Sequence, residues 1–265
     1  MDGSHSFTFK KSLGQNFLQD KNIVSNIVKK TEILPDSLIV EIGPGDGALT
    51  RELVATNNQV ISFEIDKTLK PALDKLVYDN LEIVYADFMK VDLNKYIKKY
   101  SYNKLYVIAN LPYYITTAII TKIISNYNVD YMSLMMQKEV GDRLKSSAGS
   151  RDYNSLSIFV QYYFKLEKIM DVSRNCFYPR PNVDSVVLKF TKRAYPVIAL
   201  NEQKFFLLVQ DAFRQKRKNL RNNLKNYDLA KIGDILKKFG KDITYRAEQL
   251  TIEEFIVLSN ELFAK

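Results

Sequence analysis

The segment Asn110-Leu111-Pro112-Tyr113 has the residue types needed to hold a flat base by its amino group. An exocyclic amino group is a poor nucleophile, because its lone pair is delocalised into the ring. The side-chain carbonyl of Asn110 and the backbone carbonyl of Leu111 can each accept one N–H bond, which localises that lone pair. Pro112 fixes the turn, and Tyr113 or Tyr114 can stack on the base. The segment therefore predicts alkylation of an amino group, driven mainly by positioning.

A strand-end turn with core tyrosines is the alternative interpretation of this segment. It accounts for Pro112 and the two tyrosines, Tyr113 and Tyr114. It accounts less well for an asparagine that ends an apolar run, because a buried strand seldom needs an amide at its tip. The other strand ends therefore decide between the two interpretations.

Glycines and an acid follow the first two expected strands. Gly43, Gly45 and Gly47 lie in "EIGPGDGALT", and Glu64 comes 21 positions after Gly43. Such glycines let the backbone approach a ligand, and an acid at this spacing holds ribose hydroxyls in dinucleotide-binding folds. A carboxylate accepts from two adjacent hydroxyls. The spacing suits NAD or any other adenosine cofactor, and glycine-rich turns also serve packing alone.

Asp87 ends the third expected strand, in "YADFMK". It could accept from the amino group of an adenine ring. An N-cap of the following helical turn is an equally ordinary task for this residue. Asp87 is therefore a candidate cofactor residue only in combination with the other strand tips.

Alternating strands and helices must position these residues. Strands are expected over 38–43, 59–66, 81–87, 104–110 and 131–137, with helices between them that include 20–30 and 115–126. This βαβ spacing predicts an α/β fold with a parallel, doubly wound sheet of the Rossmann type. Ligands bind such sheets at the carboxyl ends of the strands. Beyond residue 156 a helix passes into a strand, and Ser185 to Phe190 resembles an edge strand.

The chain then becomes helical and basic. The last quarter, from Thr191, holds 15 basic and 9 acidic residues, and the whole chain has a net charge of +9. We expect a catalytic domain over residues 1–195 and a small helical domain over 196–265. A basic surplus favours an acidic partner such as nucleic acid, although a solvated surface is the simpler alternative.

Composition excludes several classes of protein. Cys176 is the only cysteine and His5 the only histidine, so an internal disulfide is impossible and a histidine-based catalytic or metal site is not expected. No apolar run is long enough to span a membrane, and the N-terminus lacks a secretory hydrophobic segment. We therefore expect a cytoplasmic protein without a metal or a membrane partner.

A cluster of cations in "AFRQKRKNLRNNL" is a candidate site for RNA phosphates. On a continuous helix Arg214, Lys218 and Arg221 share one face, with Arg217 at its border. Phe213, Leu220 and Leu224 would form the opposite, apolar stripe. Few acids are interleaved, so contact with phosphate is favoured over a solvated face. Lys10, Lys11 and Arg143 are expected to extend this surface.

Six ordered motifs closely resemble one family. They are "KKSLGQNFLQD", "EIGPGDGALT", "NLPYYITT", "MMQKEVGDRL", "FYPRPNVDSVVLKF" and "AFRQKRKNLRNNL", which together span roughly residues 9 to 255. The family is that of the small-subunit ribosomal RNA adenine N6,N6-dimethyltransferases, the KsgA or RsmA type. The resemblance implies transfer of four methyl groups from S-adenosylmethionine to N6 of two adjacent adenosines in the hairpin loop near the 3′ end of 16S-type RNA. It implies a monomer that acts on a pre-30S-type particle.

The resemblance also implies the roles of individual residues. The cofactor would contact Asn16, Leu18, Gly43, Gly45, Glu64, Asp87 and Asn110, and the target adenine would lie against Asn110, Leu111, Pro112 and Tyr113, with Phe177 on its other side. Tyr114 stands where the family often has asparagine, so we assign stacking to Tyr113. Asp46 receives no role, because the family varies there.

Four other functions remain as alternatives. The erythromycin-resistance methyltransferases share fold and chemistry but act on large-subunit RNA, and "FYPRPNVDS" favours the small-subunit family over them. A mitochondrial transcription factor built on the same scaffold is disfavoured, since nothing like a transit peptide precedes "LGQNFL". An NAD oxidoreductase would leave "NLPY" unexplained. A non-catalytic ribosome-biogenesis factor could coexist with the enzyme.

Overall fold

The computed structural model describes residues 15–195 and 197–264. The chain forms two compact units, Met1–Gly141 with Leu166–Lys192 and Asp142–Lys165 with Arg193–Lys265. Seven strands form one sheet in the order β4-β3-β2-β5-β6-β9-β7. Their bounds are β2 Ser37–Ile42, β3 Gln59–Glu64, β4 Leu81–Tyr85, β5 Lys104–Asn110, β6 Tyr131–Gln137, β7 Phe164–Val172 and β9 Ser185–Lys192.

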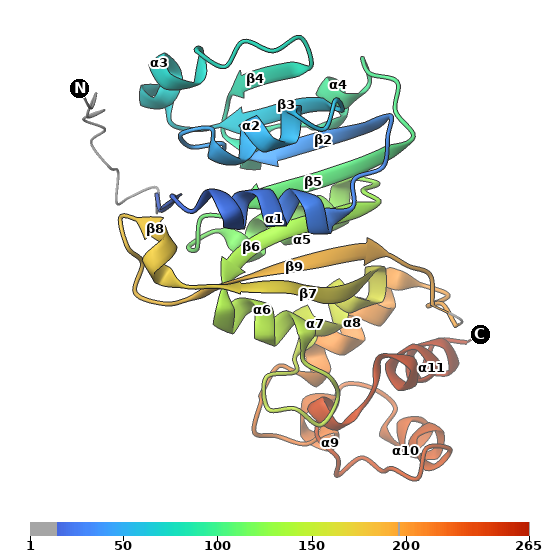
Figure 1. Cartoon of the computed structure of the whole chain (residues 1–265). Helices are drawn as coiled ribbons and strands as arrows, with labels where there is room; N and C mark the ends of the chain where they lie inside the picture. Colours follow the sequence, from blue (N-terminus) through green and yellow to red (C-terminus); the bar gives the residue numbers. More distant parts are fainter. Residues whose placement is uncertain (1–14, 196, 265) are drawn as a thin grey trace. The chain divides into compact units, whose positions relative to one another are not determined.

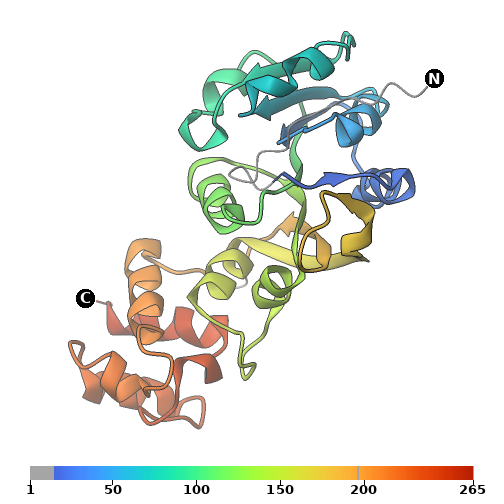
Figure 2. The ribbon, with the colours of Figure 1, turned by 90° about the vertical axis from the view of Figure 1, so that its left-hand side faces the viewer.

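The first five strands of this sheet are parallel, as the alternation of elements predicts. Every residue of β2 is buried, as expected for a strand covered on both faces. Helices α1 (Lys21–Thr31) and α2 (Ala48–Val54) lie on one face, and α5 (Thr116–Asn126) lies on the other (Figures 1 and 2). The chain runs outward from β2 to β4 and then returns to β5 on the other side of β2. This reversal creates a switch point between β2 and β5, where open α/β sheets bind ligands.

The expectation that residues 185–190 form an edge strand is wrong. β9 lies between β6 and β7 and pairs antiparallel with β6 from Tyr131↔Thr191 to Gln137↔Ser185. Val186, Val187 and Leu188 are fully buried, so the strand belongs to the core. The preceding prolines suggest an edge, but they lie in the loop before the strand and remove no hydrogen bond from its ladder.

A two-stranded antiparallel ribbon joins distant parts of the first unit. β1 (Phe17–Leu18) pairs with β8 (Phe177–Tyr178), with Leu18 opposite Phe177. Asp20 then caps α1 by accepting hydrogen bonds from the backbone N–H groups of Asn22 and Ile23. The ribbon thus holds the N-terminal segment, which precedes β2 in the chain, against residues 177–178.

The connections after β3 and β4 are shorter and less regular than the sequence predicts. The connection after β3 contains only η2 (Lys67–Leu69) and α3 (Lys70–Leu73), with Pro71 in the first turn of α3. After β4 come η3 (Phe88–Lys90) and α4 (Asn94–Ile97), and the sequence does not predict α4. Four-residue helices leave too little periodicity for a sequence pattern to reveal them.

The second unit has its own helical core. Its long elements are α7 (Ser155–Tyr163), α8 (Glu202–Ala212), α10 (Leu229–Lys237) and α11 (Ile252–Leu262), with α9 (Leu220–Asn223) and η5 (Ala247–Gln249) as short turns. Phe205, Leu208 and Phe255 are fully buried in this core. The unit takes in α7 and the end of α6 (Lys138–Lys145), which lie before the boundary that composition suggests. No helix in the described part of the chain is long and apolar enough to cross a membrane.

Candidate active site

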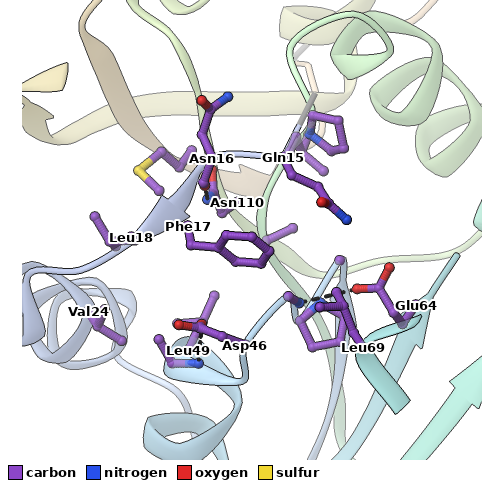
Figure 3. Close-up of a pocket in the computed structure, with 18 of the residues that line it drawn as sticks. Gln15, Asn16, Phe17, Leu18, Val24, Asp46, Leu49, Glu64, Leu69 and Asn110 are labelled. Carbon is purple, nitrogen blue, oxygen red and sulfur yellow. Dashed lines mark hydrogen bonds between the residues drawn. The ribbon is translucent and has the colours of Figure 1, made fainter. Parts of the chain in front are cut away.

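One pocket lies at the carboxyl ends of β2, β3 and β5, at the switch point of the sheet (Figure 3). It brings together most of the residues that the sequence singles out. They are Asn16, Leu18, Gly43, Gly45, Glu64, Asn110, Leu111, Pro112 and Tyr113. Residues that lie far apart in the sequence thus share one cavity, because parallel strands place their ends at one edge of the sheet.

The glycine loop after β2 forms the floor of the pocket. Gly43 and Gly45 have φ of +72° and +61°, a conformation that other residues adopt only with strain. A Cβ on Gly45 would lie 2.8 Å from the ring of Phe17. The loop therefore needs glycine both for its backbone shape and for the close approach of Phe17.

Glu64 ends β3 and is almost fully buried at 4% exposure. Its carboxylate accepts hydrogen bonds from the backbone N–H groups of Gly45 (3.2 Å) and Asp66 (2.7 Å). Burial raises the pKa of Glu64, and these two hydrogen bonds offset part of the rise. Each carboxylate oxygen has a second lone pair, so the group can still accept from the hydroxyls of a ligand.

Glu64 lies near three further buried or half-buried acids, which are Glu41, Asp46 and Asp66. Burial raises the pKa of Asp46, and it raises the pKa of Glu41 to about 7. The Oε2 atom of Glu41 accepts from Ser62 and Thr50, while its Oε1 atom has no hydrogen-bond partner among the described residues. Of these acids, Glu64 and Asp46 line the pocket, where their carboxyl groups can accept hydrogen bonds from the hydroxyls of a ligand.

Asn110 is fixed in one orientation at the end of β5. Its Nδ2 atom donates to the backbone carbonyl of Asn16 at 3.1 Å. A carbonyl can only accept, so the amide nitrogen must face Asn16 and the Oδ1 atom must face the other way. The N-terminal segment thereby holds Asn110 as an acceptor toward the pocket.

The turn after Asn110 is held by further hydrogen bonds. The Leu111 N–H donates to the Met135 carbonyl, and the Thr116 hydroxyl donates to the Pro112 carbonyl at 2.9 Å. No described residue donates to the Leu111 carbonyl, which leaves it able to accept from a ligand. The Tyr113 hydroxyl shares a hydrogen bond of 2.7 Å with Ser185, which fixes the position of the ring.

Two of the predicted residues do not line this pocket. Asp87 is the N-cap of η3 and accepts from the Met89 N–H at 2.9 Å, which is the alternative role that the sequence leaves open. Phe177 is 4% exposed and packs in the core beside Leu18. Their contacts with cofactor and base remain predictions.

Several lining residues are not predicted by the sequence. Gln15, Phe17, Pro44, Asp46, Leu49, Ile65 and Leu69 also face the pocket. The positions of Pro44 and Asp46 between the loop glycines are a signal that could have identified them. Leu49 and Leu69 carry no such signal, because apolar residues at the start of a helix are indistinguishable from core residues in sequence.

The basic segment of the second unit is not a helix face, so that prediction is wrong. Residues 213–219 form turns between α8 and α9, and only Arg221 of the predicted cations lies in a helix. Asn223 donates to the carbonyls of Ala212 and Gln215, and Asn219 caps α9. These asparagines offer the backbone an alternative to a continuous helix.

The predicted division into exposed cations and buried apolar residues nevertheless holds. Arg214, Arg217, Lys218 and Arg221 are exposed, while Leu220 and Leu224 are fully buried. No described residue forms an ion pair with these four cations. Arg143 is half-buried on α6, and Lys10 and Lys11 lie outside the described residues.

Comparison with known proteins decides the family. The sequence model of the family described as "Ribosomal RNA adenine dimethylase" matches residues 6–263. The chain belongs to the ribosomal RNA adenine dimethylase family. It is therefore an S-adenosylmethionine-dependent methyltransferase that acts on adenine of ribosomal RNA, and the resemblance seen in the sequence is confirmed.

Curated relatives specify the branch. Proteins named "Ribosomal RNA small subunit methyltransferase A" from Oceanobacillus iheyensis and Bacillus cytotoxicus are 41% and 44% identical. The alignments cover 98% and 97% of this chain and 92% of each relative. These values support the small-subunit dimethyltransferase over the erythromycin-resistance type.

Solved structures confirm the Rossmann-like methyltransferase fold of the family. A dimethyladenosine transferase from Plasmodium falciparum is 26% identical with a TM-score of 0.77, over 91% of this chain and 95% of that one. The 23S rRNA methyltransferase ErmE is 27% identical with a TM-score of 0.73, over 93% and 99%. Fold similarity alone does not separate the two substrates, because both structures match well.

Proposed function

We propose that this ribosomal RNA adenine dimethylase uses the pocket at the β2–β5 switch point to methylate N6 of two adjacent adenosines in the 3′-terminal hairpin loop of small-subunit RNA. The observation that carries the proposal is the orientation of Asn110, whose amide nitrogen is occupied by Asn16. This leaves Oδ1 of Asn110 and the Leu111 carbonyl as two acceptors at the end of one strand.

Two acceptors match the two N–H bonds of an adenine amino group. When both bonds are engaged, the nitrogen lone pair is directed out of the plane of the base. S-adenosylmethionine, when bound, supplies a methyl group on a positively charged sulfur, and the new N–CH₃ bond forms as the S–CH₃ bond breaks. The proton leaves the nitrogen afterwards, so the chain needs no general base, which agrees with the absence of histidine from its sequence outside His5.

The pocket residues fit the cofactor. Glu64 retains acceptor capacity for ribose hydroxyls, and Asp46 adds a second carboxyl group to the pocket lining. The walls supplied by Leu18, Leu49 and Leu69 suit a flat adenine ring. Asp87 is proposed to accept from the adenine amino group with the oxygen that it does not use to cap η3.

Aromatic rings are proposed to hold the target base. The Tyr113 ring is fixed by Ser185 and lines the pocket, which suits a stacking surface. Phe177 is proposed for the opposite side of the base, since its partner strand β1 carries Leu18 into the same pocket. A flipped base is commonly held between flat or apolar groups.

The exposed cations Arg214, Arg217, Lys218 and Arg221 are proposed to bind RNA phosphates. We further propose that the substrate is a pre-30S-type particle, that the enzyme acts as a monomer, and that it works in the cytoplasm where such particles are assembled. The helical unit, residues 196–265 by composition, is proposed as the part that grips RNA.

The deciding experiment offers labelled S-adenosylmethionine with undermethylated small and large ribosomal subunits separately and identifies the modified nucleoside. Dimethyladenosine in the small subunit alone is the expected result. Label in the large subunit would instead favour methylation of 23S rRNA, the activity for which ErmE is named, with the same pocket chemistry. Binding of the cofactor without transfer to either subunit would contradict the proposal and indicate a binding protein.

A further inference from the structure

The tyrosine next to the pocket, Tyr114, has a different environment from its neighbour. Tyr113 is half-buried and hydrogen-bonded to Ser185, whereas Tyr114 is 61% exposed. Within the described part of the chain, the Tyr114 side chain makes no hydrogen bond, ion pair or ring contact. One ring of the tandem pair therefore faces the pocket, and the other faces solvent directly beside it.

The backbone presents Tyr114 rigidly. Residues 113–115 form a turn whose two ends are fixed, because Ile115 N–H and the Thr116 hydroxyl both donate to the Pro112 carbonyl, at 3.2 Å and 2.9 Å. Thr116 is buried at 1% exposure, so α5 begins from a fixed point. The turn therefore fixes the backbone position from which the Tyr114 side chain extends.

The proposed substrate supplies a partner for such a ring. Moving one of two adjacent adenosines into the pocket removes it from the stack with its neighbour, and unstacking costs free energy. An aromatic ring beside the pocket can replace the lost contact, since stacking on a side chain accepts any base. Tyr114 follows Tyr113 directly in the chain, so a solvent-exposed ring stands one residue from the ring that is proposed to hold the target base.

We propose that Tyr114 is a stacking platform for the nucleobase adjacent to the target adenine. The inference rests on the proposed function of the pocket and adds a second base site outside it. Because both adenosines are substrates in turn, the platform serves whichever of them is not in the pocket. Tyr114 is thus a positioning residue for RNA and touches neither the cofactor nor the reacting nitrogen.

Steady-state methyl transfer to undermethylated small subunits tests the platform. Tyr114→Ala should raise KM for the particle roughly tenfold, as expected for loss of one stacked base. The Kd for S-adenosylmethionine should not change, and Tyr114→Phe should restore the KM. Tyr114→Leu should remain impaired, because leucine keeps an apolar surface but loses the flat ring. Tyr78→Ala is the matched control, since Tyr78 is 44% exposed and precedes β4, an edge strand of the sheet that is two strands away from β2.

A fluorescence measurement makes the test independent of catalysis. An RNA hairpin carries two adjacent adenosines, and 2-aminopurine replaces the one beside the target. Wild-type protein and Tyr114→Phe should quench the 2-aminopurine, and Tyr114→Leu should not. Equal quenching by all three proteins would overturn the platform even if methyl transfer proceeds. An unchanged KM in Tyr114→Ala, or an equal loss of cofactor affinity, would overturn it as well. If wild-type protein methylates neither subunit, the proposed function fails, while quenching still decides the role of Tyr114.

Discussion

The strand-tip pocket and the basic segment around Arg217 are both proposed to meet RNA, yet they are built in opposite ways. In the pocket, Glu64 and Asn110 each make hydrogen bonds to distant parts of the chain. In the basic segment, Arg214, Arg217 and Lys218 are exposed on turns and form no ion pair with a described residue. The pocket holds its hydrogen-bonding atoms in fixed positions, whereas the basic segment carries its charges on long, solvent-exposed side chains.

This difference follows from what each region has to recognise. A methyl transfer requires an acceptor in one orientation, so the pocket is assembled from buried strand ends and a rigid turn. Phosphates are numerous and similar, so long side chains in solvent suffice to attract them. We therefore expect pocket substitutions to change the reaction at any salt concentration, and substitutions in the basic segment to act through binding and salt.

The largest expected effect comes from Asn110→Ala, which removes one acceptor of the amino group. The rate of methyl transfer should fall by roughly 100-fold to 1,000-fold, as for loss of one preorganised hydrogen-bonding group. Cofactor affinity, measured by calorimetry, should remain largely intact. Asn126→Ala is the control, because Asn126 is exposed and donates only within α5. Full activity of Asn110→Ala would show that the pocket does not act through a fixed acceptor at this position.

Glu64→Ala should weaken cofactor binding by about tenfold to 100-fold, the range expected for lost hydrogen bonds to a charged group. The loss should be the same at low and high salt, because the carboxylate is buried. Equilibrium binding of S-adenosylmethionine at two salt concentrations measures this. Glu82→Ala is the control, as Glu82 on β4 pairs with Lys99 away from the pocket lining. An unchanged Kd would show that the ribose contact is wrongly assigned.

Replacing both Arg217 and Lys218 by Ala should weaken RNA binding by about tenfold at moderate salt. It should also flatten the dependence of log K on log salt by about 1.5, because two phosphate contacts are lost. The double variant Lys237→Ala, Lys238→Ala removes the same charge from the same unit, where both lysines already pair with acids. The control should change the slope little. Equal slopes in all three proteins would mean that the segment is simply solvated.

The smallest expected effect on activity comes from Glu41→Gln. This substitution should mainly change how the free energy of unfolding depends on pH. The pKa of Glu41 is raised by burial from 4.5 to about 7, so the folded chain holds this proton more tightly than the unfolded chain. Its contribution to the free energy of unfolding is full below about pH 4.5 and is lost as pH rises to about 7, by roughly 3 kcal/mol at most. Denaturant unfolding from pH 4.5 to 7.5 should show this decline in wild-type protein and a flatter profile in Glu41→Gln.

The parallel sheet explains why much of the pocket could be predicted. Gly43, Glu64 and Asn110 are far apart in sequence, but each lies at the end of a strand. The lengths of the apolar runs and their spacing along the chain locate these strands well. Asn16 and Leu18 precede the sheet and could be placed only through family resemblance, since the β1–β8 ribbon is too short to leave a pattern. The family and its small-subunit branch could be identified from long sequence motifs. Secondary-structure propensities alone would not have identified them.

The errors in the sequence interpretation have local causes. The helix expected through Arg217 does not form, because Asn219 and Asn223 satisfy backbone groups that a helix would use internally. The interior position of β9 is hidden in the sequence, because Ser185 to Phe190 alternates too little to show which edge it pairs with. In both cases the structure is decided by an interaction between residues that a search for local sequence periodicity does not relate to each other.

The β1–β8 ribbon has a thermodynamic consequence for the two ligands. Leu18, proposed for the cofactor, and Phe177, proposed for the target base, are opposite each other in the ribbon. A ligand that restricts the motion of one strand would also restrict its hydrogen-bonded partner, and this would lower the entropic cost of forming the second site. Linkage requires the effect to be mutual: if S-adenosylmethionine tightens RNA binding by some factor, RNA must tighten cofactor binding by the same factor. Loss of the cofactor's affinity advantage after transfer would then loosen the methylated RNA, and the ribbon would help to release the product.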